Sequence, residues 1–174
     1  MCDALPGDVG EREFESYVAS QWRPLLRAGW LLTGNWAAAE DLVQSALARV
    51  WAHWARVRSV AERDAYVRRM LTNQFLEQQR RRSSTELPSD ALPESPTSDA
   101  TTDVDRRLSL TRALDELPPQ QRAAVVLRYF QDQSLEQTAA ALGCSIGTAK
   151  SQTSRALAKL RRSTHLDALL QGNY

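Results

Sequence analysis

The spacing of apolar residues predicts that most of the chain is helical. Between Glu11 and Leu32, apolar side chains recur at intervals of three and four residues, which is the pattern of one face of an amphipathic helix. They are Phe14, Val18, Trp22, Leu25, Leu26 and Trp30. Pro24 is expected to kink this helix. Residues 1–10, which contain Pro6 and two glycines, are expected to form a loose terminus.

Two further helices are expected to follow within the N-terminal half. The first covers residues 36–57, after the break at Thr33-Gly34-Asn35, where Asn35 is a good N-cap. Its apolar side holds Leu42, Val43, Leu47, Val50, Trp51 and Trp54. The second runs from about Glu62 to Arg82 and buries Tyr66, Val67, Met70, Leu71 and Phe75. Three helices with short turns predict a small all-α domain over residues 11–82.

The next segment, residues 83–105, has a different composition. It contains six acidic side chains, no basic one, and many Pro, Ser and Thr residues. Such a segment cannot bury enough apolar surface to order itself, so it is predicted to be a flexible acidic linker. Helices over 106–117 and 119–130 are expected beyond it, separated by Leu117-Pro118-Pro119.

Residues 134–162 have the pattern of a helix-turn-helix. Ser134 can cap a first helix with Gln137 as its capping-box partner, and Gly143 permits the left-handed turn that ends that helix. Ser145 can cap a second helix. One buried stripe is expected to contain Ile146, Ala149, Leu157 and Leu160. This motif completes a second all-α domain over residues 106–163; the alternative is a surface hairpin with a solvated basic face.

Charge is strongly segregated, although the formal net charge is only +1. Residues 106–162 hold ten basic and four acidic side chains, so the basic part of the chain is a module suited to nucleic acid. No long apolar run or leader segment is apparent, which favours a cytoplasmic protein. Cys2 and Cys144 fit no ligand cluster, and Cys144 is expected on the inward side of the turn. No metal or cofactor is expected.

Four stretches, in their order along the chain, resemble the extracytoplasmic-function (ECF) subfamily of bacterial sigma-70 factors. They are Ala39-Glu40-Asp41-Leu42-Val43-Gln44 with Val50-Trp51, residues 66–82, Leu114 to Arg122, and Gly147-Thr148-Ala149-Lys150-Ser151. Tyr66-Val67-Arg68-Arg69-Met70 and the tryptophan-rich first helices are most similar to the actinobacterial SigE-like subgroup. The resemblance implies a sigma region 2-like domain over 11–82 and a region 4-like domain over 106–163. It also implies an alternative transcription initiation factor rather than an enzyme.

For the −35 promoter element, the resemblance places a set of polar and basic side chains toward the major groove, with two arginines as phosphate contacts. The groove-facing set is Thr148, Lys150, Ser151, Gln152 and Arg155, and the phosphate contacts are Arg122 and Arg128. Many relatives carry a basic residue at the position of Gln152. Because Gln can read adenine and Arg favours guanine, the −35 preference of this chain need not follow that of its relatives.

For the −10 element, the resemblance implies that the loop 58–64 and the neighbourhood of Asn73 hold a flipped base. Strand phosphates would be bound by Arg68, Arg69, Arg80, Arg81 and Arg82. For Arg80 to Arg82 the alternative is an ordinary solvated basic face.

The resemblance also implies protein partners: core RNA polymerase, through its β′ clamp and β subunits, and an anti-sigma factor. Asp41, Leu42 and Gln44 would bind polymerase; the alternative is that Asp41 only complements the helix dipole and Leu42 only packs in the core.

Two other functions account for parts of the sequence. A dimeric helix-turn-helix regulator explains residues 106–162 but leaves the Asp41 region, the arginine-rich helix and the acidic linker without a role, and no heptad seam is present. An enzyme is disfavoured because His53 and His165 lie in different segments and no nucleophile, phosphate-loop or metal-ligand pattern occurs.

Overall fold

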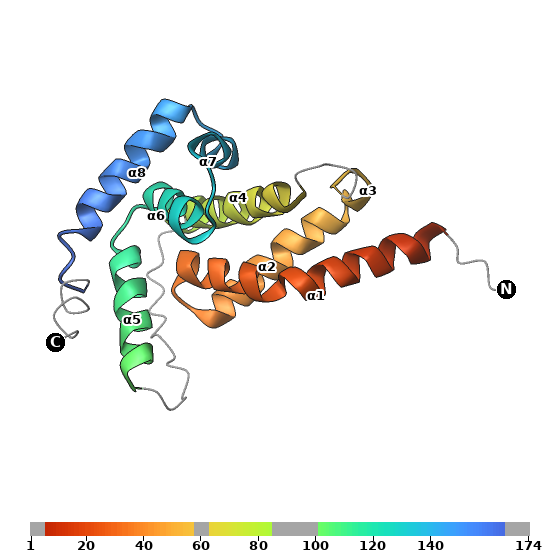
Figure 1. Cartoon of the computed structure of the whole chain (residues 1–174), viewed down its shortest axis with the longest axis horizontal. Coiled ribbons are helices and arrows are strands. Elements are labelled where there is room, and N and C mark those ends of the chain that lie inside the picture. The colour runs from red at the N-terminus through yellow and green to blue at the C-terminus, as the bar shows by residue number, and fades with distance from the viewer. Residues whose placement is uncertain (1–5, 58–62, 85–100, 166–174) are drawn as a thin grey trace.

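The computed structural model describes residues 6–57, 63–84 and 101–165, and it contains helices and turns without strands in those ranges (Figure 1). The N-terminal half consists of α1 (Pro6–Thr33), α2 (Trp36–Trp51), α3 (Trp54–Val57) and α4 (Arg63–Ser84). Helix α2 packs against both α1 and α4, so the all-α fold predicted for this part of the chain is confirmed.

The C-terminal half consists of α5 (Thr101–Asp115), α6 (Pro119–Val125), the π-helix η1 (Val126–Phe130), α7 (Leu135–Leu142) and α8 (Ile146–Leu160). Helix α8 packs on α6 and α7. The predicted helix-turn-helix is confirmed in detail: the Ser134 Oγ accepts from the Gln137 amide at 3.1 Å, and the Gln137 side chain accepts from the Ser134 amide at 2.8 Å. Gly143 adopts φ +64° and ends α7.

Several helix bounds differ from the sequence-based expectations. Helix α1 begins at Pro6, where the missing proline amide costs no hydrogen bond, so residues 6–10 are not a loose terminus. The helix expected over 36–57 is divided at Ala52 and His53. The helix expected over 119–130 changes to π geometry, with the Gln131 amide bonded to the Val126 carbonyl at 3.0 Å. Both ends of the expected linker are helical, because residues 83–84 belong to α4 and residues 101–105 belong to α5. Its central residues 85–100 lie outside the described ranges.

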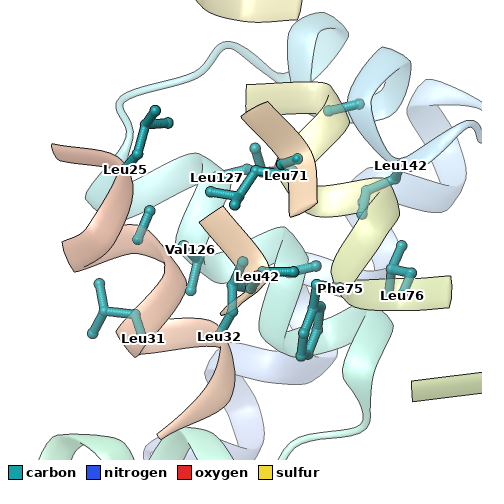
Figure 2. Close-up of a cluster of buried hydrophobic side chains, with 14 of the residues drawn as sticks. Leu25, Leu31, Leu32, Leu42, Leu71, Phe75, Leu76, Val126, Leu127 and Leu142 are labelled. Carbon is teal, nitrogen blue, oxygen red and sulfur yellow. The ribbon is translucent and has the colours of Figure 1, made fainter. Parts of the chain in front are cut away.

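The helices of the two halves share one hydrophobic core. Leu25, Leu31 and Leu32 of α1 lie beside Leu42 of α2, Leu71, Phe75 and Leu76 of α4, Val126 and Leu127 of η1, and Leu142 of α7 (Figure 2). Helix α4 also packs along α7. The two predicted domains are therefore in direct contact, an arrangement that the sequence did not predict.

Two large side chains predicted to be buried are exposed instead. Trp51 is 45% exposed and rests against Phe14, with ring centroids 5.0 Å apart, while Trp54 is buried as expected. Ile146, the first residue of α8, is 48% exposed. Thr153 and Ala156 occupy the buried stripe with Ala149 and Leu160.

Candidate nucleic-acid interface

Helix α8 presents a polar face opposite its buried stripe. The side chains of Thr148, Lys150 and Arg155 are exposed, and those of Ser151 and Gln152 are half-exposed. Ser145 caps the helix, its Oγ accepting from the Thr148 amide at 3.1 Å and lying 2.9 Å from the Thr148 Oγ1. A helix whose polar side chains begin in the first turn can place them against base edges in a major groove.

The two arginines proposed as −35 phosphate contacts lie in different environments. Arg122 is only 9% exposed; its Nη1 donates to the Leu32 carbonyl at 2.8 Å and lies 2.7 Å from the Asp115 Oδ1. In this arrangement Arg122 cannot contact DNA. Arg128 is half-buried and donates to the Gln133 carbonyl, which fastens η1 to the turn before α7.

Burial perturbs both members of the Arg122–Asp115 pair. Removal from water raises the pKa of Asp115, an effect that the positive Arg122 opposes only in part. Burial likewise lowers the pKa of Arg122, and Asp115 opposes that change. No sequence pattern indicates this pair, because its partner groups come from α1, α5 and α6.

Helix α4 carries the proposed −10 residues along much of its length. Arg69 and Arg80 to Arg82 are exposed, whereas Arg68 and Asn73 are half-buried. Arg68 and Arg69 also line a hollow of about 200 Å³ with Gln137, Ala140 and Ala141 of α7. The first helix of the helix-turn-helix therefore covers part of this face of α4.

An ion-pair relay that sequence reasoning missed ties the end of α4 to α2. Glu77 lies 3.0 Å from Arg49 of α2 and 2.5 Å from Arg81. The hydrogen bond and positive charge of Arg49 lower the pKa of Glu77. Only the Glu77–Arg81 spacing of four residues could have been noticed in the sequence.

The residues proposed for polymerase binding differ in their exposure to solvent. Asp41 and Gln44 are exposed on α2, but Leu42 has 0% exposure and packs in the core. Leu42 therefore packs in the core, which was the alternative to polymerase binding. In this conformation it cannot serve as an apolar contact for polymerase.

The loop implied to hold a flipped base is described only at its end. Residues 58–62 lie outside the described ranges, and Arg63 stacks over the Tyr17 ring at 5.3 Å from its centroid. Within the ranges that the structure describes, no group of His, Cys, Asp and Glu has the arrangement of a metal site. His53 is exposed, with its Nδ1 3.1 Å from the Arg49 carbonyl, and Cys144 packs partly against the core.

Comparisons with known proteins match two successive parts of the chain. The Sigma-70 region 2 family model matches residues 18–85, and the Sigma-70 region 4 model matches residues 107–160. The chain is 45% identical over 149 residues to an RNA polymerase sigma-E factor of Streptomyces coelicolor, covering 86% of this chain and 84% of that protein. It is 37% identical to the ECF RNA polymerase sigma factor SigE of Mycolicibacterium smegmatis, covering 91% of this chain and 64% of that protein.

Solved structures give the same result at the level of the fold. The sigma factor RpoE of Bartonella quintana, solved with the anti-sigma factor NepR, matches with a TM-score of 0.69 and 28% identity, covering 90% of this chain and 99% of that one. CnrH, solved with the cytosolic domain of CnrY, matches with a TM-score of 0.58 at 22% identity, over 94% of this chain and 91% of CnrH.

A helical region 2 unit followed by a region 4 helix-turn-helix defines a class of transcription initiation proteins. The chain belongs to the sigma-70 family of RNA polymerase sigma factors, and within it to the ECF group. The predicted family, and its sigma-E-like character, are thus confirmed. In the described part of the chain, no helix is long and apolar enough to span a membrane.

Proposed function

We propose that this ECF factor brings core RNA polymerase to promoters whose −35 element is read by α8 and whose −10 element is bound by α4. The observation that carries the −35 role is the capped α8, on which Thr148, Lys150 and Arg155 are exposed outside the buried stripe. Base discrimination would come from Ser151 and Gln152 together with these residues. Nearby Lys159, Arg161 and Arg162, all exposed, would add contacts to phosphates.

The proposed −10 role rests on the basic surface of α4. Arg69, Arg80 and Arg82 are exposed and suited to the phosphates of a separated strand, and Arg81 can join them by leaving Glu77. Asn73 would help to hold an unstacked base, whose capture offsets part of the cost of strand opening. Arg68 is half-buried beside α7, so movement of α7 away from α4 would increase its exposure.

The proposed polymerase surface on α2 is polar. Asp41 and Gln44 are exposed there, and the β′ clamp is the proposed partner, with β contacted elsewhere. An anti-sigma factor is a further proposed partner, because the RpoE structure that this chain resembles was solved with one. We place this activity in the cytoplasm, where polymerase acts, and assign the protein no covalent chemistry of its own.

The experiment that tests this proposal is run-off transcription with purified core polymerase on a library of randomised −35 and −10 elements. Addition of the protein should yield transcripts from a defined subset of promoters. Asp41→Ala should reduce their yield, whereas Glu15→Ala, which removes an exposed carboxylate from α1, should not. Specific binding to duplex DNA without any protein-dependent transcript would instead support a free-standing regulator.

A further inference from the structure

A hollow of about 580 Å³ is lined by residues of α1, α4, η1 and the turn that follows η1. This volume is within the range of pockets that bind small molecules. Its apolar lining includes Leu25 and Leu31 of α1, both of which belong to the buried core. Because the lining comes from helices far apart in the sequence, no single stretch of the chain reveals this hollow.

Three arginines give the hollow a positive charge. Arg23 and Arg27 are exposed and four residues apart on α1, so they share one face of that helix, and Arg68 reaches the hollow from α4. None of the three forms an ion pair with a carboxylate in the part of the chain that the structure describes. Guanidinium groups bind phosphate oxygens in a bidentate manner, so these side chains favour a phosphorylated ligand.

Two aromatic rings line the same hollow. Tyr129 is 56% exposed and Phe130 is 45% exposed, which leaves ring surface open to a ligand. The backbone here is irregular, since η1 is a π-helix and Asp132, just beyond it, has φ +50°. Such backbone features are frequent at functional sites. Exposed aromatic rings can stack on a nucleobase of any sequence.

Two oxygen acceptors at the end of η1 complete the lining. The Gln131 Oε1 is buried and has no hydrogen-bond partner among the residues that the structure describes. Asp132 is exposed and is the one acidic residue among those that line the hollow. A carboxylate repels phosphate but accepts hydrogen bonds from ribose hydroxyls. Gln131 and Asp132 are therefore suited to the sugar and base of a ligand whose phosphates lie on the arginines.

We propose that this hollow binds a purine ribonucleoside diphosphate or triphosphate. Arg23, Arg27 and Arg68 hold its phosphates, while Tyr129 and Phe130 contact its base. A purine is favoured because its two fused rings offer more area for stacking than a pyrimidine. This site goes beyond the proposed function, which assigns no small molecule to the protein.

Titration calorimetry of the full chain with ADP and GDP tests the site. Each should bind saturably, with one molecule per chain. UDP and inorganic pyrophosphate should bind more weakly, because the first has a smaller ring and the second has no base. The 2′-deoxy forms of ADP and GDP should bind about fivefold more weakly, since they lack one hydroxyl that Asp132 would accept from.

Substitutions locate the bound nucleotide. Arg27→Gln should weaken binding by about tenfold, through loss of a charged hydrogen bond to phosphate. Tyr129→Ala should also weaken it by about tenfold, whereas Tyr129→Phe, which keeps the ring, should bind as the parent does. The matched control is Arg155→Gln, which removes the same charge from an exposed position on α8 and should leave binding unchanged. Circular dichroism would verify that each variant remains helical.

The opposite results would overturn the proposal. Absence of saturable binding by both ADP and GDP would do so, and so would pyrophosphate binding as tightly as ADP. Equal losses in Arg27→Gln and Arg155→Gln would show attraction to any basic surface instead of a site. Equal binding of ribose and 2′-deoxyribose forms would remove Asp132 from it. Finally, if only a single strand of DNA of about ten nucleotides bound, and did so through Arg27 and Tyr129, the hollow would belong to the promoter strand and not to a nucleotide.

Discussion

Asp41 and Leu42 are neighbours on α2, yet burial gives them different roles. Asp41 is exposed and remains a candidate contact for polymerase, whereas Leu42 is enclosed by the core. The same distinction separates Arg122, which binds the Leu32 carbonyl and Asp115, from the exposed Arg155. For each of these side chains, exposure determines whether a partner can reach it.

Substitution of Gln152 should change base preference at one position of the −35 element. Gln152→Arg is expected to move that preference from adenine toward guanine, because Gln pairs bidentately with adenine and Arg with guanine. The change should be worth about 1–3 kcal/mol, or roughly five- to 150-fold in relative transcript yield. Sequencing of transcripts from the randomised −35 library measures it.

Lys159→Ala is the control for that experiment. Lys159 is exposed near the end of α8 and is suited to a phosphate, so its loss should weaken all promoters alike and reduce the salt dependence of binding. An unchanged base preference in Gln152→Arg would contradict the proposal that Gln152 contacts a base of the −35 element.

At the scale of single elements, the helix-turn-helix contains two glycines in different backbone conformations. Gly143 has φ +64°, and no atom lies within 4 Å of the position that a Cβ would take, so any cost of a side chain there arises from the backbone alone. Gly147 lies in the first turn of α8 with ordinary helical geometry, and an added Cβ would meet only the Ser145 Oγ at 3.9 Å.

Substitution by alanine should change the free energy of unfolding in opposite directions at these two positions. Gly143→Ala is expected to lower the free energy of unfolding by about 1 kcal/mol, because an L-residue is strained in the left-handed region. Gly147→Ala should raise it by up to about 1 kcal/mol, because alanine loses less backbone entropy in a helix. Urea denaturation of both variants measures the pair, and equal destabilisation would contradict the assigned turn.

The Arg49–Glu77–Arg81 relay predicts a pH-dependent link between α2 and α4. Since the folded state lowers the pKa of Glu77, its contribution is complete above the ordinary pKa of 4.5 and is lost as the pH falls through the lower folded value. The stability difference between the parent and Glu77→Gln should therefore be largest near neutral pH and vanish in acid. Urea titrations over this pH range, with Glu15→Gln as the control, measure the difference; one that grew on acidification would refute the relay.

For the whole molecule, the shared core predicts that the two halves unfold together. All five tryptophans lie between residues 22 and 54, so tryptophan fluorescence reports only the N-terminal half, whereas far-ultraviolet circular dichroism reports helices of both halves. The two signals should follow one urea transition with the same midpoint. A separate dichroism transition after the fluorescence change is complete would show that the halves are independent.

Much of the local structure was determined by the sequence. Ser134, Gln137, Gly143 and Ser145 act through groups only a few residues away, so the helix-turn-helix and its caps could be predicted and are confirmed. The spacing of apolar residues likewise identified the main helices, because a helix must bury one face. The helix bounds were harder to predict, since a start at Pro6 and a π-turn after Val125 depend on backbone bonds that no periodicity reveals.

Only the tertiary structure decided how the halves meet. The hydrogen bond from Arg122 to the Leu32 carbonyl joins groups 90 residues apart, and the shared core assembles side chains from α1, α2, α4, η1 and α7. Helical periodicity shows that a side chain is buried but not which helix covers it, so Arg122 was predicted to contact phosphate and Ile146 to be buried. The sequence by itself thus determined the family and its helices, whereas long-range packing determined which of their surfaces are free.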